Sequence, residues 1–139
     1  MKNERSSGFI VFRQEDEKRL YLLLHYEAGH WDFVKGNVED GEDEVEAATR
    51  ELGEETGITD IKIVDKFREK IGYFYKRDSV LIRKEVIFFA GTTKESEVKL
   101  SFEHIGYMWT DYDEAMKVLT YKSAKNVLVL AEEYIKKIA

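Results

Sequence analysis

The segment from Gly36 to Ile58 limits the possible folds and functions of this chain more than any other part of the sequence. It reads GNVEDGEDEVEAATRELGEETGI, and its middle alternates apolar and acidic residues at helical spacing. Asp40 or Asp43 can cap the start of this helix, and Gly57 suits the left-handed position that commonly ends one. The segment therefore predicts a loop, a helix and a second loop.

The acidic residues of this helix point to metal chemistry. Glu51 and Glu55 lie one turn apart with Glu54 between them in angle, so their carboxylates share one strip of surface and repel one another. A hard divalent cation with oxygen ligands, Mg²⁺ or alternatively Mn²⁺, is the natural compensation. Arg50 is expected to orient the neighbouring carboxylates through charge-assisted hydrogen bonds.

The other face of the helix is expected to pack on a core, since Val45, Ala48 and Leu52 follow helical spacing. Gly53 does not suit the interior of a helix, where it costs roughly 1 kcal/mol of stability relative to Ala. A close approach by another backbone would account for a glycine at this position. The alternative is an ordinary solvated acidic helix, which 36% charged residues would make unsurprising. The fixed context of glycines and one arginine favours the metal site instead.

Composition excludes several classes of function. The chain has 139 residues, 43% of them hydrophobic, which suits one domain over residues 1–139. Without Cys, disulfides, thiolate catalysis and Cys-ligated zinc are excluded. No apolar run is long enough for a membrane span, so we expect a cytoplasmic protein. A net charge of -6 argues against broad nucleic-acid or anionic-membrane binding and leaves a small anionic nucleotide, held with metal, as partner.

Periodicity predicts strands on both sides of the acidic helix and helices at the end of the chain. A mixed sheet packed between helices, an α/β fold of α/β/α type, accounts for this order. In the last helix, Val127, Leu130, Ala131, Tyr134 and Ile138 are expected on the buried side. The expected strands are 8–13, 20–26, 31–34, 61–67, 71–75, 85–92 and 105–109, and the expected terminal helices are 111–119 and 123–138.

The spacing G-x5-E-x7-R-E-U-x-E-E-x-G-U, with Leu52 and Ile58 at the aliphatic U positions, is that of the Nudix box, and the chain resembles the Nudix hydrolases. Its fixed polar and glycine positions are Gly36, Glu42, Arg50, Glu51, Glu54, Glu55 and Gly57. The resemblance implies hydrolysis of phosphoanhydride bonds, with Glu51, Glu54, Glu55 and the carbonyl of Gly36 around the metal.

Flanking segments resemble the asymmetrical diadenosine tetraphosphate hydrolases of animal and archaeal type. His30 to Gly36 is similar to their H-W-x-x-P-K-G, and Leu100 to Trp109 to their L-S-x-E-H-x-x-Y-x-W. One departure is Val34, which stands where that group usually has Pro and removes a stiff entry to the loop. Because a β-branched residue also favours extended backbone, the expected cost is modest.

The resemblance also implies residues that bind substrate. Lys35 and Lys84 would offer positive charge to a polyphosphate, with Arg83 as the alternative to Lys84. His30 could bind phosphate oxygens or assist proton transfer. Tyr73 and Tyr121 could stack on either side of an adenine, against core packing as the alternative.

A carboxylate outside the helix, Glu103, could join the metal site or take a proton from water. The general base therefore stays open among Glu51, Glu55 and Glu103. His104 is interpreted as a structural residue and His25 as a sheet residue.

The reaction implied is attack of metal-activated water on diadenosine tetraphosphate, giving ATP and AMP. Other Nudix substrates, namely nucleoside triphosphates, capped RNA or diphosphoinositol polyphosphates, would use the same box with a different pocket. A non-catalytic nucleotide sensor is the alternative of another class, although such a domain would be expected to have lost some acids of the box.

Overall fold

Strand β1 (Lys2–Glu15) is the centre of the sheet in the computed structural model, which describes residues 1–138. Along one edge it pairs in parallel with β7 (Val80–Thr92), from Lys2 opposite Ile82 to Phe12 opposite Thr92. Its other edge is divided between β4 (Val34–Asn37) and β2 (Lys18–Tyr26), both antiparallel. This division places the start of the acidic segment directly beside β1.

The remaining strands extend the sheet on both sides. β3 (Trp31–Asp32) and β8 (His104–Thr110) pair with β2, while β5 (Lys62–Ile63) and β6 (Glu69–Arg77) pair with β7. All four pairings are antiparallel, so within residues 1–138 the sheet is mixed and its one parallel pair is β1 with β7.

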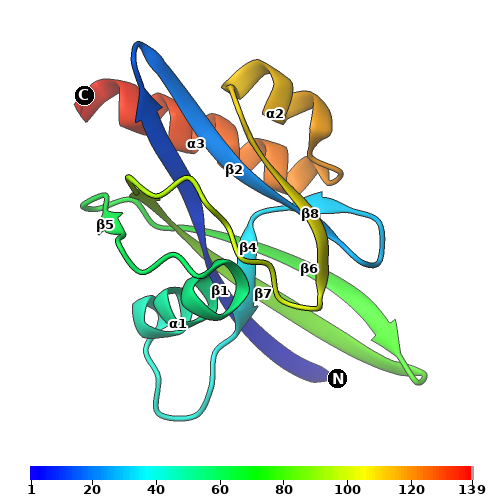
Figure 1. The fold of residues 1–139 in the computed structure, drawn as a ribbon. Coiled ribbons are helices and arrows are strands. Elements are labelled where there is room, and N and C mark those ends of the chain that lie inside the picture. The colour runs from blue at the N-terminus through cyan, green and yellow to red at the C-terminus, as the bar shows by residue number, and fades with distance from the viewer. Residues whose placement is uncertain (139) are drawn as a thin grey trace.

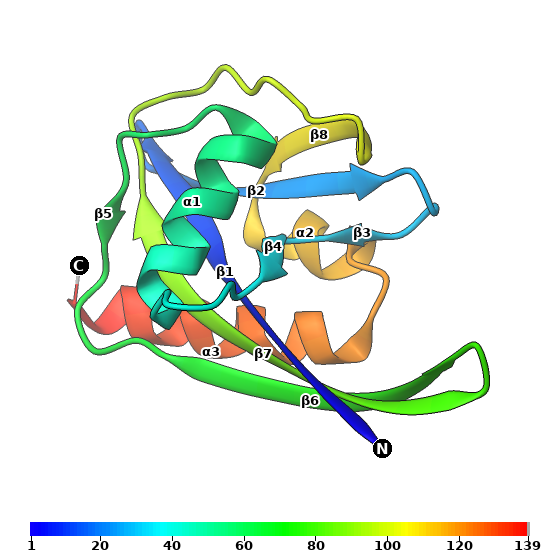
Figure 2. The ribbon, with the colours of Figure 1, turned by 90° about the horizontal axis from the view of Figure 1, so that it is seen from below.

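Helices cover both faces of the sheet (Figures 1 and 2). Helix α1 (Glu44–Thr56) lies on one face, and α2 (Tyr112–Val118) and α3 (Lys122–Ile138) lie on the other. Successive residues of β1 feed the two cores, because strand side chains alternate between faces: Phe9 and Val11 pack on the α1 side, Ile10 and Phe12 on the α3 side. The expected α/β/α arrangement is confirmed. No helix within residues 1–138 is long and apolar enough to cross a membrane.

The strands differ in length from the prediction. β1 begins well before the predicted residue 8, because parallel pairing with β7 satisfies the backbone of its polar residues 2–7. β7 begins before the predicted residue 85, because its first residues pair with β6. The strand predicted over 61–67 shrinks to β5, since Lys66 adopts a positive φ of 66° and breaks the extended run. Val64 and Phe67 nevertheless enter the α3-side core from the loop.

The buried side of α3 was wrongly predicted at two positions. Leu130 and Ile138 are 43% and 57% exposed, and Glu132 is buried instead. The Glu132 carboxylate accepts hydrogen bonds from the Tyr21 hydroxyl at 2.5 Å and from Arg19 at 2.9 Å. The buried Glu132 carboxylate has its hydrogen-bond partners on β2. The face of α3 that packs on the core therefore differs from the face that its apolar residues alone indicate.

Candidate active site

Helix α1 begins and ends where its sequence indicates. The Asp43 carboxylate caps the start by accepting a hydrogen bond from the Glu46 backbone N–H at 2.8 Å. The Glu46 carboxylate in turn accepts one from the Asp43 backbone N–H at 3.0 Å. Gly57 ends the helix at φ 75°, with its N–H bonded to the Gly53 carbonyl. Ala48 and Leu52 are fully buried as expected, whereas Val45 is exposed, which corrects the predicted apolar face.

The close approach that the sequence suggested at Gly53 occurs at Gly36. A Cβ atom on Gly53 would have no neighbour within 4 Å, so that explanation of Gly53 was wrong. A Cβ on Gly36 would lie 2.0 Å from the carboxyl carbon of Glu51. The missing side chain of Gly36 therefore makes the space that the Glu51 carboxylate occupies above strand β4.

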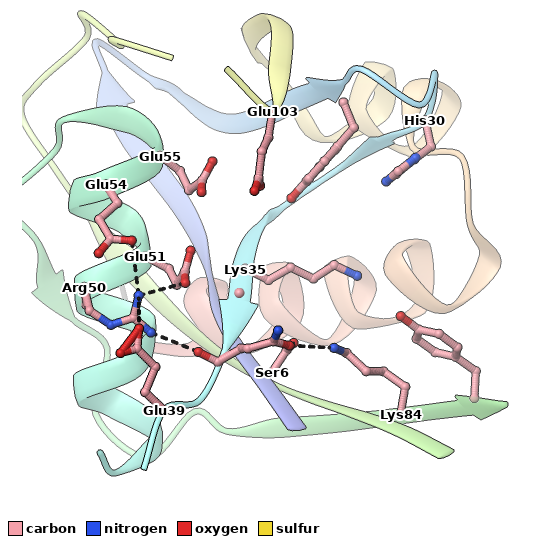
Figure 3. Close-up of a pocket in the computed structure, with 14 residues that line it drawn as sticks. Ser6, His30, Lys35, Glu39, Arg50, Glu51, Glu54, Glu55, Lys84 and Glu103 are labelled. Atoms are coloured by element: carbon pink, nitrogen blue, oxygen red, sulfur yellow. Dashed lines mark hydrogen bonds and ion pairs between the residues drawn. The ribbon is translucent and has the colours of Figure 1, made fainter. Parts of the chain in front are cut away.

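A cleft of about 620 Å³ opens between the exposed face of α1 and the sheet (Figure 3). Nearly all the predicted site residues line it, and Tyr121 is the exception. Four lining residues escaped the sequence analysis: Ser6, Tyr26, Asn37 and Glu39. The predicted residues in the lining are His30, Lys35, Gly36, Arg50, Glu51, Glu54, Glu55, Tyr73, Lys84 and Glu103.

Arg50 holds the acidic side of the cleft together. Its guanidinium donates to Glu42 at 2.7 Å, to Glu51 at 2.9 Å and to Glu54 at 3.2 Å. A further donor reaches the backbone carbonyl of Asn37 at 2.9 Å, at the end of β4 (Figure 3). Arg50 thus fixes the helix carboxylates against the loop, and the hydrogen bond with Glu42 is the main reason why its pKa is raised.

Two of the helix carboxylates are unfavourable as anions in this environment. Burial raises the pKa of Glu51 despite the nearby Arg50, and the charges of Glu55 and Glu54 raise it further. Burial also raises the pKa of Glu55, to which the charge of Glu103 adds. A cation in the cleft would relieve both effects.

The donor set suits such a cation. Carboxylate oxygens with an adjacent backbone carbonyl are ligands for Mg²⁺ or Mn²⁺, and Gly36 leaves the room that the Glu51 carboxylate needs. Within residues 1–138, however, no group of three or more acidic or histidine side chains already converges on one ion position. Glu51 and Glu54 are turned toward Arg50 instead. The predicted carboxylates share the cleft without forming a preassembled cradle.

Glu55 has partners that the sequence analysis missed as site residues. Its Oε2 accepts the Ser101 hydroxyl at 2.5 Å and lies 2.9 Å from Nδ1 of His104, whose side chain is buried. Glu103 lies between these two residues in sequence and enters the cleft beside Glu55 (Figure 3). Ser101 and His104 are polar residues next to Glu103 in sequence, and this was the one sign that they could belong to the site. Nothing in the spacing of the sequence indicates that they contact Glu55.

The basic side of the cleft comes from the sheet. Lys35 on β4 lies 3.2 Å from the buried carboxylate of Asp32 and 6.0 Å from the ring centre of Tyr73 on β6. Lys84 on β7 donates to the Asn37 side chain at 2.9 Å, and burial lowers its pKa. Val34, in place of a proline, is buried in β4 opposite Phe9 and keeps the extended backbone that was expected.

A residue near the start of the chain supports Lys84. Glu4 lies 3.5 Å from the Lys84 ammonium and accepts hydrogen bonds from Tyr75 at 2.5 Å and Arg77 at 2.7 Å. These hydrogen bonds, Tyr75 first, lower the pKa of Glu4 to about 2. Arg83, the alternative to Lys84, pairs with Glu85 and does not line the cleft.

The predicted aromatic pair is split. Tyr73 lines the cleft, whereas Tyr121 lies outside the lining, with its ring 5.4 Å from that of His30. His30 is itself stacked on Tyr26 at 4.5 Å, and burial lowers its pKa. His25 stacks on a tryptophan of β3, as expected for a sheet residue.

Known proteins resemble this chain over almost its whole length. The NUDIX domain family model matches residues 2–131. An asymmetrical bis(5'-nucleosyl)-tetraphosphatase of Sus scrofa is 34% identical over 94% of this chain and 95% of its own. A solved C. elegans Ap4A hydrolase binary complex superposes with a TM-score of 0.86 at 28% identity, covering 96% of this chain and 98% of that one.

A second kind of relative is more distant. An RNA pyrophosphohydrolase of Sulfurovum is 28% identical over 98% of both chains. With its cleft, its box helix and a domain match of nearly full length, the chain belongs to the NUDIX family and is a Nudix hydrolase.

Proposed function

We propose that this protein hydrolyses dinucleoside polyphosphates and cleaves diadenosine tetraphosphate asymmetrically into ATP and AMP. The observation that carries the proposal is the division of one cleft into an acidic side on α1 and a basic side on the sheet. A bound polyphosphate needs both sides: cations against its own charge, and carboxylates that hold a metal next to the bond to be broken. The names of the tetraphosphatase relatives support the choice of substrate.

The acidic side would hold the metal. Glu51, Glu54 and Glu55 are the proposed side-chain ligands, with the Gly36 carbonyl as a backbone ligand and Mg²⁺ or Mn²⁺ as the ion. The ion, when bound, lowers the pKa of a coordinated water and neutralises charge on phosphoryl oxygens. Arg50 orients the carboxylates through the hydrogen bonds it already makes.

The basic side would hold the phosphates. Lys35 and Lys84 are the proposed contacts to phosphoryl oxygens, and His30, which also lines the cleft, adds a donor. The attacking water gives its proton to one of the carboxylates that face the cleft, Glu51, Glu55 or Glu103. The raised pKa of Glu51 and of Glu55 brings each nearer to the range in which a carboxylate accepts a proton well.

The nucleoside would stack on Tyr73, which is 39% exposed and lies at the basic end of the cleft. Tyr121 lies outside the cleft lining, with its ring 5.4 Å from that of His30, and is proposed to contribute less than Tyr73 to stacking on the base. An aromatic platform of this kind tolerates different bases, because every base has a π-face. Few basic residues line the cleft, which supports a nucleotide over a diphosphoinositol polyphosphate.

A capped or triphosphorylated RNA end is the second candidate substrate, favoured by the RNA pyrophosphohydrolase relative. A non-catalytic sensor is less well supported, because every acid of the box is retained and Arg50 with three of them lines the cleft.

One assay separates these candidates. Purified protein is incubated with Mg²⁺ and a panel of diadenosine tetraphosphate, nucleoside triphosphates, 5'-triphosphorylated RNA and a diphosphoinositol polyphosphate, and products are identified by chromatography. ATP plus AMP from diadenosine tetraphosphate, at the highest kcat/KM of the panel, is expected. Faster turnover of another member, without ATP plus AMP, would contradict the proposed substrate. No turnover of any member would favour a sensor.

A further inference from the structure

The segment 99–104 is attached to the C-terminal end of α1 through backbone hydrogen bonds. Lys99 donates to the Thr56 carbonyl at 2.9 Å, and Ser101 donates to the Glu55 carbonyl at 3.3 Å. These carbonyls belong to the last turn of the helix, where no intrahelical donor is available. The segment therefore has a fixed position relative to Glu55.

Two side chains of this segment converge on a single atom. The Ser101 hydroxyl and His104 Nδ1 both lie within hydrogen-bond distance of Glu55 Oε2, at 2.5 and 2.9 Å. Among the described residues, Oε1 of Glu55 has no hydrogen-bond partner. Ser101 and His104 thus hold Oε2 in place, while Oε1 stays available to a ligand in the cleft that Glu55 lines.

The surroundings of His104 determine which ring nitrogen carries the proton. Nε2 is buried and has no partner among the described residues, and the ring packs edge-on against Tyr26 at 4.4 Å. A proton on Nε2 would be a buried donor without an acceptor, and it would turn the Nδ1 lone pair toward a carboxylate oxygen. The geometry assigns the proton to Nδ1, which faces the Ser101 hydroxyl, its hydrogen-bond partner, at 3.2 Å and the Glu55 carboxylate at 2.9 Å.

We propose that Ser101 and His104 form a clamp that positions Glu55 for the reaction. They touch neither substrate nor metal and act through Glu55. The clamp also links Glu55 to Glu103, because the Ser101 hydroxyl accepts the Glu103 N–H at 3.3 Å and the Glu103 carbonyl binds the Glu27 N–H at 2.9 Å. Two neighbouring carboxylates that line the cleft thereby share one support (Figure 3).

The inference rests on the proposed function in so far as Glu55 is a metal ligand, and partners behind a ligating carboxylate typically change metal affinity or activity by 10–100-fold. Four variants test it: S101A, H104F, H104N and H104Q. Asn can present an amide N–H close to the Nδ1 position, Gln presents its own close to the Nε2 position, and Phe keeps the ring without a donor.

Three measurements are made on each purified variant: the Kd for Mn²⁺ without nucleotide by electron paramagnetic resonance, kcat and KM on the substrate that the wild type hydrolyses best, and the melting temperature. His25→Asn is the matched control, since His25 also stacks on an aromatic ring of the sheet but does not line the cleft. It is expected to leave Kd and kcat within twofold.

S101A, H104F and H104Q are expected to weaken Mn²⁺ binding or lower kcat by about 10–100-fold, with KM within threefold. H104N should stay within about threefold of the wild type in both. A role in packing alone predicts the reverse order, with Phe tolerated best and the smaller Asn worst. That reverse order would overturn the clamp, as would Kd and kcat within twofold for both H104F and S101A.

The outcome is separable from that of the proposed function. The comparison uses whichever substrate the wild type turns over, so a different substrate leaves it intact. A lower kcat with unchanged Kd in S101A and H104F supports the clamp and contradicts the metal-ligand role of Glu55. S101A keeps the test valid if a replacement of the buried His104 fails to fold, because Ser101 is only partly buried.

Discussion

The two sides of the cleft are built in different ways. The acidic side comes largely from one continuous segment, in which α1 carries Glu51, Glu54 and Glu55, and Arg50 donates hydrogen bonds to Glu51 and Glu54. The basic side is assembled from separate strands, with Lys35 on β4, Tyr73 on β6 and Lys84 on β7.

Asn37 joins the two sides, because its backbone carbonyl accepts from Arg50 and its side-chain oxygen accepts from Lys84. The acidic side therefore depends on the local geometry of one helix, and the basic side depends on the register of several strands. Mutations should therefore act on the two sides in different ways.

The largest effect is expected on the acidic side from Gly36→Ala. A Cβ there would overlap the Glu51 carboxyl group at 2.0 Å, so the carboxylate must move. A displacement of about 1 Å can cost a hundredfold, and we expect kcat to fall at least that much. Gly53→Ala on the same segment is the control, since nothing lies within 4 Å of its Cβ. It should keep kcat and raise stability by about 1 kcal/mol. Equal kcat for the two variants would contradict this account of the acidic side.

A smaller effect is expected on the basic side from Lys84→Met. Loss of a charged hydrogen bond to phosphate costs about 1.5–3 kcal/mol, so kcat/KM should fall roughly 10–100-fold. Arg83→Met, the neighbouring position on the same strand, removes a cation that pairs with Glu85 outside the cleft. Its kcat/KM should stay within about twofold. If both variants lose activity equally, general charge attraction rather than Lys84 itself holds the substrate.

The aromatic residues should show a smaller difference. Tyr73→Ala is expected to raise KM roughly tenfold through lost stacking, with kcat nearly unchanged. Tyr121→Ala should raise KM less, because Tyr121 lies outside the cleft lining, with its ring 5.4 Å from that of His30. Steady-state kinetics on both variants measures the difference. A larger KM effect for Tyr121 would show that substrate binding closes the cleft differently from the arrangement described.

The smallest effect concerns stability and returns to the acidic side. Burial raises the native pKa of Glu51 above 4.5, the pKa of an ordinary glutamate and of Glu51 in the unfolded chain. At pH values between the unfolded and the native pKa, the native state therefore binds more protons than the unfolded chain. Metal-free wild type must therefore lose stability as the pH rises through that interval. Glu51→Gln should melt higher than wild type in EDTA at pH 7 and converge with it below about pH 4.5. Glu54→Gln is the control, because its side chain is 57% exposed and should change melting little.

The sequence allowed the acidic side to be predicted closely because helical period, caps and charge spacing act over a few residues. Asp43, Gly57 and the buried Leu52 lie where local rules put them. The close approach suggested at Gly53 was wrong and is found at Gly36, since space around a glycine depends on what folds against it and not on its neighbours in sequence.

The basic side was predicted only where the family resemblance named residues. Glu4 and Asn37 carry no signal of their own, because their contacts arise from the parallel register of β1 with β7 and from the end of β4. His104 was interpreted as structural, and its burial agrees with that. Its contact with Glu55 follows from the path of segment 99–104 along the end of α1, which no periodicity encodes.

The parallel pairing of β1 with β7 also sets an order of assembly. Glu4 and Lys84 are 80 residues apart in sequence yet meet across adjacent strands, and contacts of such separation form slowly because a long loop must close first. The helix with its caps needs only its own segment. A nascent chain that ends before β7 therefore already carries the entire Nudix box and Lys35, while lacking Lys84 and the strand that pairs with both β1 and β6.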